Sequence, residues 1–124
     1  MLRASLIQVL QKADIPIVSW GRVPELYEFF TIVRPAGVVN LREQGNVYVV
    51  GRMYGADLGD VDAGLQEFAL KVFHVLRQSQ EVQNIQMVPA QDLRFDEDKA
   101  YDRPAMLITC EALSRAAVLS LNAE

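Results

Sequence analysis

Cysteine and histidine are nearly absent from this 124-residue chain, which contains one of each. A single cysteine, Cys110, excludes an internal disulfide and favours a reducing compartment. One Cys and one His cannot complete any usual zinc site. Neither residue has, in the sequence around it, the base, nucleophile or orienting partner that catalysis requires. We therefore interpret His74 as a solvated surface residue and Cys110 as a buried structural thiol.

Long apolar runs are also missing. No uninterrupted apolar stretch approaches the ~20 residues that cross a membrane. Near the N-terminus, Gln8, Gln11 and Lys12 interrupt the apolar residues, so this segment resembles neither a signal peptide nor a membrane span. We expect a soluble, intracellular protein that has no membrane contact.

The sequence also lacks known motifs for binding phosphate, dinucleotides or calcium. Residues 51–55 lack both the Gly-Lys-Ser/Thr ending of a phosphate loop and the glycine pattern of a dinucleotide site. Asp57, Asp60 and Asp62 lack the spacing of a calcium loop, and capping of the following helix by Asp60 or Asp62 explains them better. We predict no catalytic residues, no metal site and no cofactor, and we do not expect an enzyme.

Acidic residues outnumber basic ones by 16 to 12, which gives a net charge of −4. This balance argues against specific nucleic-acid recognition. Nine of the twelve cations are arginines, the cation that suits interfaces because its planar fork pairs with carboxylates. Hydrophobic residues make up 51% of the chain, and the length fits one domain covering residues 1–124.

The most informative segment is a predicted helix from Asp62 to Gln80. At about 100° per residue, its apolar positions gather on one side, which predicts a core stripe. The residues on that side are Leu65, Phe68, Ala69, Val72, Leu76 and Ser79. The opposite side carries Glu67, Lys71, His74 and Gln78.

A second apolar surface lies on a flank of this helix, which carries Gln66, Leu70, Phe73, Arg77 and Gln80. A small monomer has difficulty burying a Leu and a Phe in addition to a full core stripe. Aromatic residues and Arg are enriched at interfaces. We therefore predict that Leu70, Phe73 and Arg77 contact another chain.

The first half of the chain predicts a helix and then strands. Leu2 to Ala13 has helical spacing of apolar residues. Aromatic and β-branched residues predict strands at Phe29–Arg34 and Val38–Arg42, separated by Pro35-Ala36-Gly37. Gly45 and Asn46 favour a hairpin turn at Glu43–Asn46.

The clearest strand is predicted at Val47–Tyr54. One of its faces is plainly apolar, whereas the other carries Tyr48, Arg52 and Tyr54. We predict that these three side chains also belong to an interface. Two alternatives stay open. The first helix or the C-terminal segment covers both this surface and the helix flank within the monomer, or Tyr48, Arg52 and Tyr54 line a pocket for an anionic or aromatic ligand.

The second half predicts a short strand at Gln83–Val88 and leaves a further strand at Asp92–Phe95 open. Asp96–Arg103 mixes both charge signs, as in a solvated loop or one that becomes ordered in an assembly. Pro104–Glu111 is apolar on both faces, which is typical of a strand inside a sheet. Ala112–Glu124 either extends this strand or forms a short helix.

The predicted order of elements is helix, three strands, helix, two strands. This order favours an α+β fold in which a mostly antiparallel sheet packs against an N-terminal helix and a long central helix.

The order and texture of these segments resemble the tail terminator and tail-completion proteins of long-tailed bacteriophages. The resemblance rests on the helix Leu2–Ala13, the hairpin around Glu43–Asn46, the helix Asp62–Gln80, and the charged loop Asp96–Arg103 before the strand Pro104–Glu111. The stretch from Ile15 to Phe30 has no match in that pattern. No catalytic residue is transferred, because the family is structural.

The resemblance implies a virion structural protein that closes the end of the tail tube as a hexameric ring and docks to the neck. The implied partners are copies of itself, the tail tube and head-completion proteins, with assembly in the host cytoplasm. From the residues alone, a second hypothesis stays open: a small soluble α+β ligand-binding or adaptor module, monomeric or dimeric.

Overall fold

The computed structural model describes residues 2–18, 29–51, 58–89, 93–94 and 102–113. Its centre is a four-stranded antiparallel sheet in the order β1-β2-β6-β3. The strands are β1 (Phe30–Val39), β2 (Arg42–Val50), β6 (Ala105–Leu113) and β3 (Gln83–Pro89). A separate two-stranded sheet pairs β4 (Leu93–Arg94) with β5 (Asp102–Arg103).

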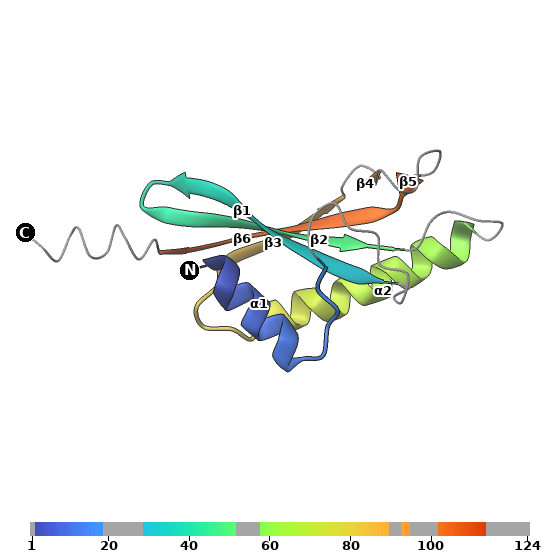
Figure 1. The fold of residues 1–124 in the computed structure, drawn as a ribbon, viewed down its shortest axis with the longest axis horizontal. Coiled ribbons are helices and arrows are strands. Elements are labelled where there is room, and N and C mark those ends of the chain that lie inside the picture. Colours follow the sequence, from blue (N-terminus) through green and yellow to red (C-terminus); the bar gives the residue numbers. More distant parts are fainter. Residues whose placement is uncertain (1, 19–28, 52–57, 90–92, 95–101, 114–124) are drawn as a thin grey trace, which may run out of the picture.

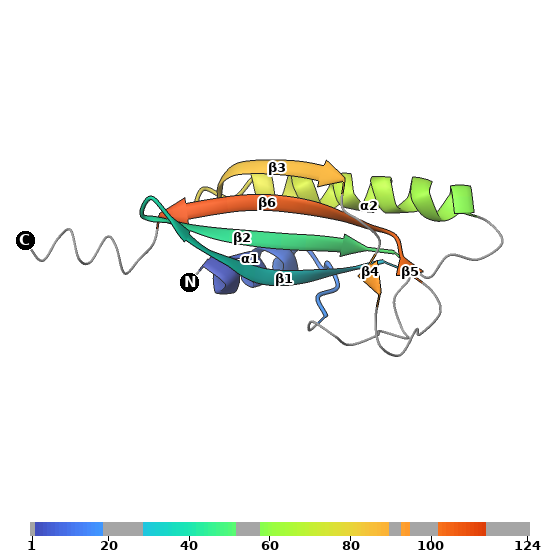
Figure 2. The ribbon, with the colours of Figure 1, turned by 90° about the horizontal axis from the view of Figure 1, so that it is seen from above.

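Two helices, α1 (Leu2–Lys12) and α2 (Leu58–Arg77), lie on the same face of the four-stranded sheet (Figure 1). Seen from above, α1 lies behind β1 and β2, and α2 runs behind β6 and β3 (Figure 2). The predicted α+β class and antiparallel sheet are therefore confirmed, and so is the position of the Pro104–Glu111 strand inside the sheet, since β6 has a neighbour on each side.

The main core fills the space between the helices and the sheet. Each helix contributes one buried stripe, and the strands contribute alternate residues. The stripes consist of Leu2, Leu6 and Leu10 on α1 and of Leu65, Ala69, Val72 and Leu76 on α2. They pack on Val33, Val47, Val49, Ile108 and Cys110.

The opposite face of the sheet carries a smaller buried cluster. Phe30, Ile32, Val50 and Ala105 form it, with Val18 and Tyr48 packed against them. β1 and β2 thus bury side chains on both faces in this half of the sheet, which explains their apolar sequence.

The segment after α1 adds a short contact along the edge of the sheet. Ile17 forms a parallel bridge to Thr31 of β1. The Val18 N–H donates to the Thr31 carbonyl at 2.8 Å, and the Thr31 N–H donates to the Pro16 carbonyl at 2.8 Å. The Thr31 hydroxyl also donates to that carbonyl, at 2.8 Å, so this buried polar side chain is satisfied.

The hairpin turn is not at Glu43–Asn46, and that prediction is wrong. The turn residues are Asn40 and Leu41, both in left-handed conformation at φ values of 51° and 64°. Two consecutive positive φ values match the tight hairpin turn whose twist suits the flanking strands. β2 begins at Arg42, so Gly45 and Asn46 lie inside the strand.

Close packing rather than a turn explains Gly45. A Cβ at this position would lie 3.0 Å from Leu2 Cδ2 and 3.1 Å from Leu6 Cδ1. α1 therefore rests on the sheet at the point where β2 has no side chain.

The prediction that Pro35-Ala36-Gly37 separates two strands is wrong. These residues lie within the single strand β1. The β1–β2 register shifts between Pro35 and Val38, and Gly37 has a φ of 93°. Proline is tolerated here because β1 is an edge strand and the irregularity removes the need for its N–H.

The predicted bounds of the second helix are also wrong at both ends. α2 begins at Leu58 instead of Asp62 and ends at Arg77 instead of Gln80. Asp60 and Asp62 lie within the helix and so are not its N-cap. Of the predicted loop Asp96–Arg103, Asp102 and Arg103 form β5, and the other residues lie outside the described residues.

Candidate interaction surface

The orientation of α2 decides which of its sides faces outward. The Phe68 ring stacks on that of Phe29, with ring centres 5.8 Å apart. Phe29 directly precedes β1, so the Phe68 side of α2 faces β1 and α1. At about 100° per residue, Leu70, Phe73 and Arg77 lie across the core stripe from Phe68, toward the β3 edge. We call these three residues the α2 flank.

The three residues of the α2 flank differ in how far they are covered. Leu70 is 49% exposed. Phe73 is half-buried and packs against the core, and the Arg77 guanidinium carbon lies 5.6 Å from the centre of its ring. The His74 ring meets the Phe73 ring edge-on, with centres 6.4 Å apart. Leu70 is therefore the member of the flank whose apolar side chain is exposed.

Tyr48 lies apart from the α2 flank. It is paired with Ile32 of β1 and Leu107 of β6, on the face of the sheet that the helices do not cover. Arg52 and Tyr54, predicted beside it, lie outside the described residues. The six predicted interface residues therefore do not form one surface, since the α2 flank and Tyr48 are on opposite sides of the sheet.

Among the described residues, the largest group of exposed apolar side chains was not predicted from the sequence. Val38, Val39 and Leu41 are 59%, 56% and 50% exposed, and they surround the β1–β2 turn. We call these three residues the hairpin tip. The sequence does contain a signal for this turn, because an asparagine interrupts the apolar run Val38-Val39-Asn40-Leu41. Since the turn was predicted at Glu43–Asn46, these residues were predicted to lie inside a strand.

A polar cluster ties three strands together beside the hairpin. The Glu111 carboxylate of β6 accepts a hydrogen bond from Gln44 of β2 at 3.0 Å and another from Asn84 of β3. Arg42 lies 3.7 Å from the same carboxylate and donates to Gln83 at 2.7 Å. The hydrogen bonds from Gln44 and Asn84, with the charge of Arg42, lower the pKa of Glu111. These side chains are hydrogen-bond partners of one another, so the cluster has a structural role in joining β2, β6 and β3.

Cys110 is a buried thiol, as predicted. Its Sγ lies 3.6 Å from the Gly45 carbonyl, to which it donates. Burial raises the pKa of the Cys110 thiol to about 11. The thiolate is the nucleophile and the metal ligand, so this side chain is unsuited to either role at neutral pH. Among the residues that the structure describes, no three His, Cys, Asp or Glu side chains gather into a set that could bind a metal ion.

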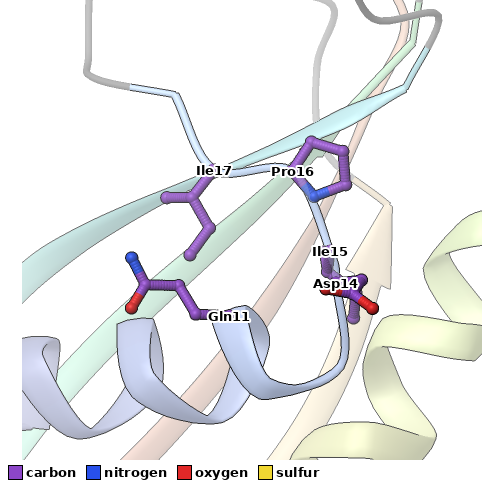
Figure 3. Close-up of a pocket in the computed structure, with 5 residues that line it drawn as sticks. All are labelled: Gln11, Asp14, Ile15, Pro16 and Ile17. Atoms are coloured by element: carbon purple, nitrogen blue, oxygen red, sulfur yellow. The ribbon is translucent and has the colours of Figure 1, made fainter.

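A hollow of about 330 Å³ lies where the chain leaves α1 (Figure 3). Gln11 reaches from the end of α1 toward Ile17, while Asp14, Ile15 and Pro16 form the connection. Asp14 has a φ of 57°. The volume is at the lower end of the range for small-molecule sites, and Asp14 supplies the charge in the lining.

Neither helix, over the residues described, is long and apolar enough to cross a membrane. Comparison of the chain with models of protein families and with curated proteins finds no match.

Proposed function

We propose that this chain is a ring-forming structural subunit of a phage tail or neck, which terminates the tail tube and docks to the head-completion complex. The observation that carries the proposal is the exposure of Leu70 on the α2 flank. A Leu that is 49% exposed beside a half-buried aromatic ring and an Arg has the composition of an interface core rather than of a solvated helix.

The arrangement of elements also supports the proposal. An opening helix, a hairpin and a second helix precede the strand β6, which keeps part of the order on which the resemblance rests. The hairpin turn lies at Asn40–Leu41 instead of Glu43–Asn46, and most of the charged loop Asp96–Arg103 lies outside the described residues. Among the described elements, both helices lie on one face of the sheet and segment 15–18 contacts the β1 edge, which leaves the β3 edge for contacts with other chains. In this function the chain acts by geometry, so it needs no catalytic group.

The first test is the mass of the protein in solution at high micromolar concentration, by size-exclusion chromatography with light scattering. A ring subunit is expected to assemble, alone or on addition of tail tubes, and to bury roughly 800 Å² per partner at each contact. A strict monomer that forms no ring with tail tubes would contradict the proposal. Capsid, portal or tail-tube genes beside the coding gene would support it.

The sharpest variant is Leu70→Asp. Leu70 is exposed, so the substitution leaves the core intact, whereas Phe73→Asp would place a carboxylate against the core. Leu70→Asp should abolish assembly while lowering the melting temperature of the monomer only slightly, because the leucine is 49% exposed and Asp has a lower helix propensity. The matched control is Gln8→Asp, an equally charged change at an exposed position of α1. Loss of assembly in both variants would assign the effect to net charge instead of to the flank.

A second candidate function is a small ligand-binding or adaptor module. The hollow at Gln11–Ile17 supports it, because its size suits a small ligand. Chemical-shift changes confined to this connection, saturable with a fragment library and lost in Gln11→Ala, would favour this function over the ring.

A further inference from the structure

The hairpin tip combines exposure with an unfavourable backbone conformation. Val38, Val39 and Leu41 are each at least half exposed, and Figures 1 and 2 place the β1–β2 turn past the end of α1. Leu41 occupies the second central position of the turn with a φ of 64°, where glycine is the residue that fits with least strain. The turn alone does not explain a leucine that is both strained and exposed. Strain and apolar exposure at the same residue therefore indicate that another segment covers the tip.

Strand β6 ends beside this tip. Leu113, its last residue, pairs with Arg42 of β2, and Arg42 pairs with Val39 of β1. Since neighbouring strands are about 4.8 Å apart, the backbone of Leu113 lies two strand spacings, roughly 10 Å, from that of Val39. Figures 1 and 2 show the end of β6 and the β1–β2 turn at the same extremity of the sheet. The chain that follows β6 therefore starts next to the tip.

Residues 114–124 follow β6 and lie outside the described residues. Their sequence carries no charge between Arg115 and Glu124, and its apolar residues are Ala116, Ala117, Val118, Leu119, Leu121 and Ala123. A segment of this length spans about 16 Å as a helix and up to about 36 Å when extended. In either of the conformations that the sequence leaves open, the segment is thus long enough to reach the tip.

Attachment to β6 favours this segment over a second copy of the chain as the cover. A segment that is tethered by a short linker has an effective concentration in the millimolar range, whereas a second copy binds only at its concentration in solution. The contact also needs no opposite charges, because the tip residues and residues 116–121 are apolar on both sides.

We propose that residues 114–121 fold back over the β1–β2 turn of their own chain and cover the hairpin tip. This contact lies within one copy, so it goes beyond the proposed function and holds whether or not the chain forms a ring. It also gives Leu41 a role, since an apolar contact at this position offsets the strain of its positive φ.

The test compares the effect of one tip variant on stability in three backgrounds. Val38→Thr/Val39→Thr keeps the β-branched shape that strands prefer but makes both side chains polar. In the wild-type chain, this change should lower the urea midpoint by roughly 0.5 M, because the covered methyl groups are lost. In a Leu119→Ser/Leu121→Ser background, where the segment has lost its apolar contacts, the shift should be much smaller. Leu70→Asp is the matched background, since it alters an exposed leucine away from the tip, and there the full shift should remain.

Hydrogen exchange gives a second readout that does not depend on unfolding. The amide N–H groups of residues 38–41 should exchange faster in Leu119→Ser/Leu121→Ser than in the wild-type chain, because the variant uncovers the turn. Leu70→Asp should leave their exchange unchanged. Equal rates in all three proteins would contradict a covered tip.

The Leu70→Asp background also separates this contact from the ring, since it removes the proposed contact between subunits. Equal midpoint shifts in all three backgrounds would overturn the proposed cover and leave the proposed function standing. A shift that disappears in Leu70→Asp and depends on protein concentration would show that a second copy covers the tip, which would also overturn it. If the chain is monomeric with and without tail tubes yet shows the predicted shifts, the proposed function is overturned and the cover is supported.

Discussion

The guanidinium of Arg77 lies over the ring of Phe73, one turn earlier on α2, with 5.6 Å between the guanidinium carbon and the ring centre. This contact covers a ring that the core leaves half-exposed. Arg77 therefore covers the Phe73 ring within the chain, and Leu70 is the exposed apolar residue of the flank.

Replacement of Arg77 by Ala should lower the free energy of unfolding by about 0.5–1 kcal/mol, the range for a cation above an aromatic ring at an exposed site. Urea denaturation in the Leu70→Asp background separates this effect from assembly. Arg77→Lys keeps the charge, so it should lower the free energy of unfolding less than Arg77→Ala does. Equal stability of all three proteins would show that the contact contributes nothing to the fold.

Gly45→Val should destabilise the protein by roughly 1–3 kcal/mol, the usual cost of overpacking. The new side chain would meet Leu2 and Leu6 where even a Cβ lies 3.0 and 3.1 Å from their methyl groups. Leu2→Ala makes room for the valine. The Gly45→Val/Leu2→Ala variant should therefore lose less free energy of unfolding than the sum of the losses in the two single variants. Additive losses, measured in urea, would mean that the side chains do not meet.

Thr31→Val should cost about 1 kcal/mol, since it removes one hydrogen bond in a buried site without changing the shape of the side chain. The Pro16 carbonyl keeps its bond from the Thr31 N–H, so no buried carbonyl is left unpaired. Thr31→Ser is the control, because it keeps the hydroxyl and loses the methyl group. A valine variant as stable as the wild-type chain would contradict this role.

The polar cluster around Glu111 should make the stability of the protein depend on pH in the acidic range. Since the folded state lowers the pKa of Glu111 below its ordinary value of 4.5, the carboxylate contributes stability above pH 4.5 that is lost as the pH falls through the folded value. The difference in stability between wild type and Glu111→Gln should therefore shrink below pH 4.5. Gln44→Leu removes one donor and should raise the pKa of Glu111 in an NMR titration. An unchanged titration would show that Gln44 does not contribute.

The sequence predicts the buried parts of this fold better than its exposed parts. The core stripe of α2 followed from helical spacing of its apolar residues, because burial on one side imposes a period. The interior position of β6 followed from its two apolar faces, because a strand inside a sheet is covered on both. The hairpin turn was misplaced because Gly45 and Asn46 have the composition of a turn. Gly45 is instead required by a contact with α1 that is distant in the chain, and no local pattern reveals such a contact.

The candidate surface shows the same limit. Leu70 was identified correctly as an apolar residue outside the core stripe, since helical geometry places it there. Tyr48 could not be placed relative to it, because the side of the sheet that the helices cover is a property of the whole fold. The exposure of Val38 and Val39 depends on how far the hairpin extends beyond α1, which alternation along a strand does not indicate.

The strand order has a consequence for how the chain folds. β6 lies between β2 and β3, yet it follows both in the sequence, and Val47 pairs with Ile108 across a long separation. While the protein is being synthesised, α1 and the β1–β2 hairpin can form early, but β3 has no strand to pair with until residues 105–113 have been made. Pairing between strands that are distant in the sequence is slow to form. Folding should therefore complete late, with the joining of the two halves by their last strand as its slow step.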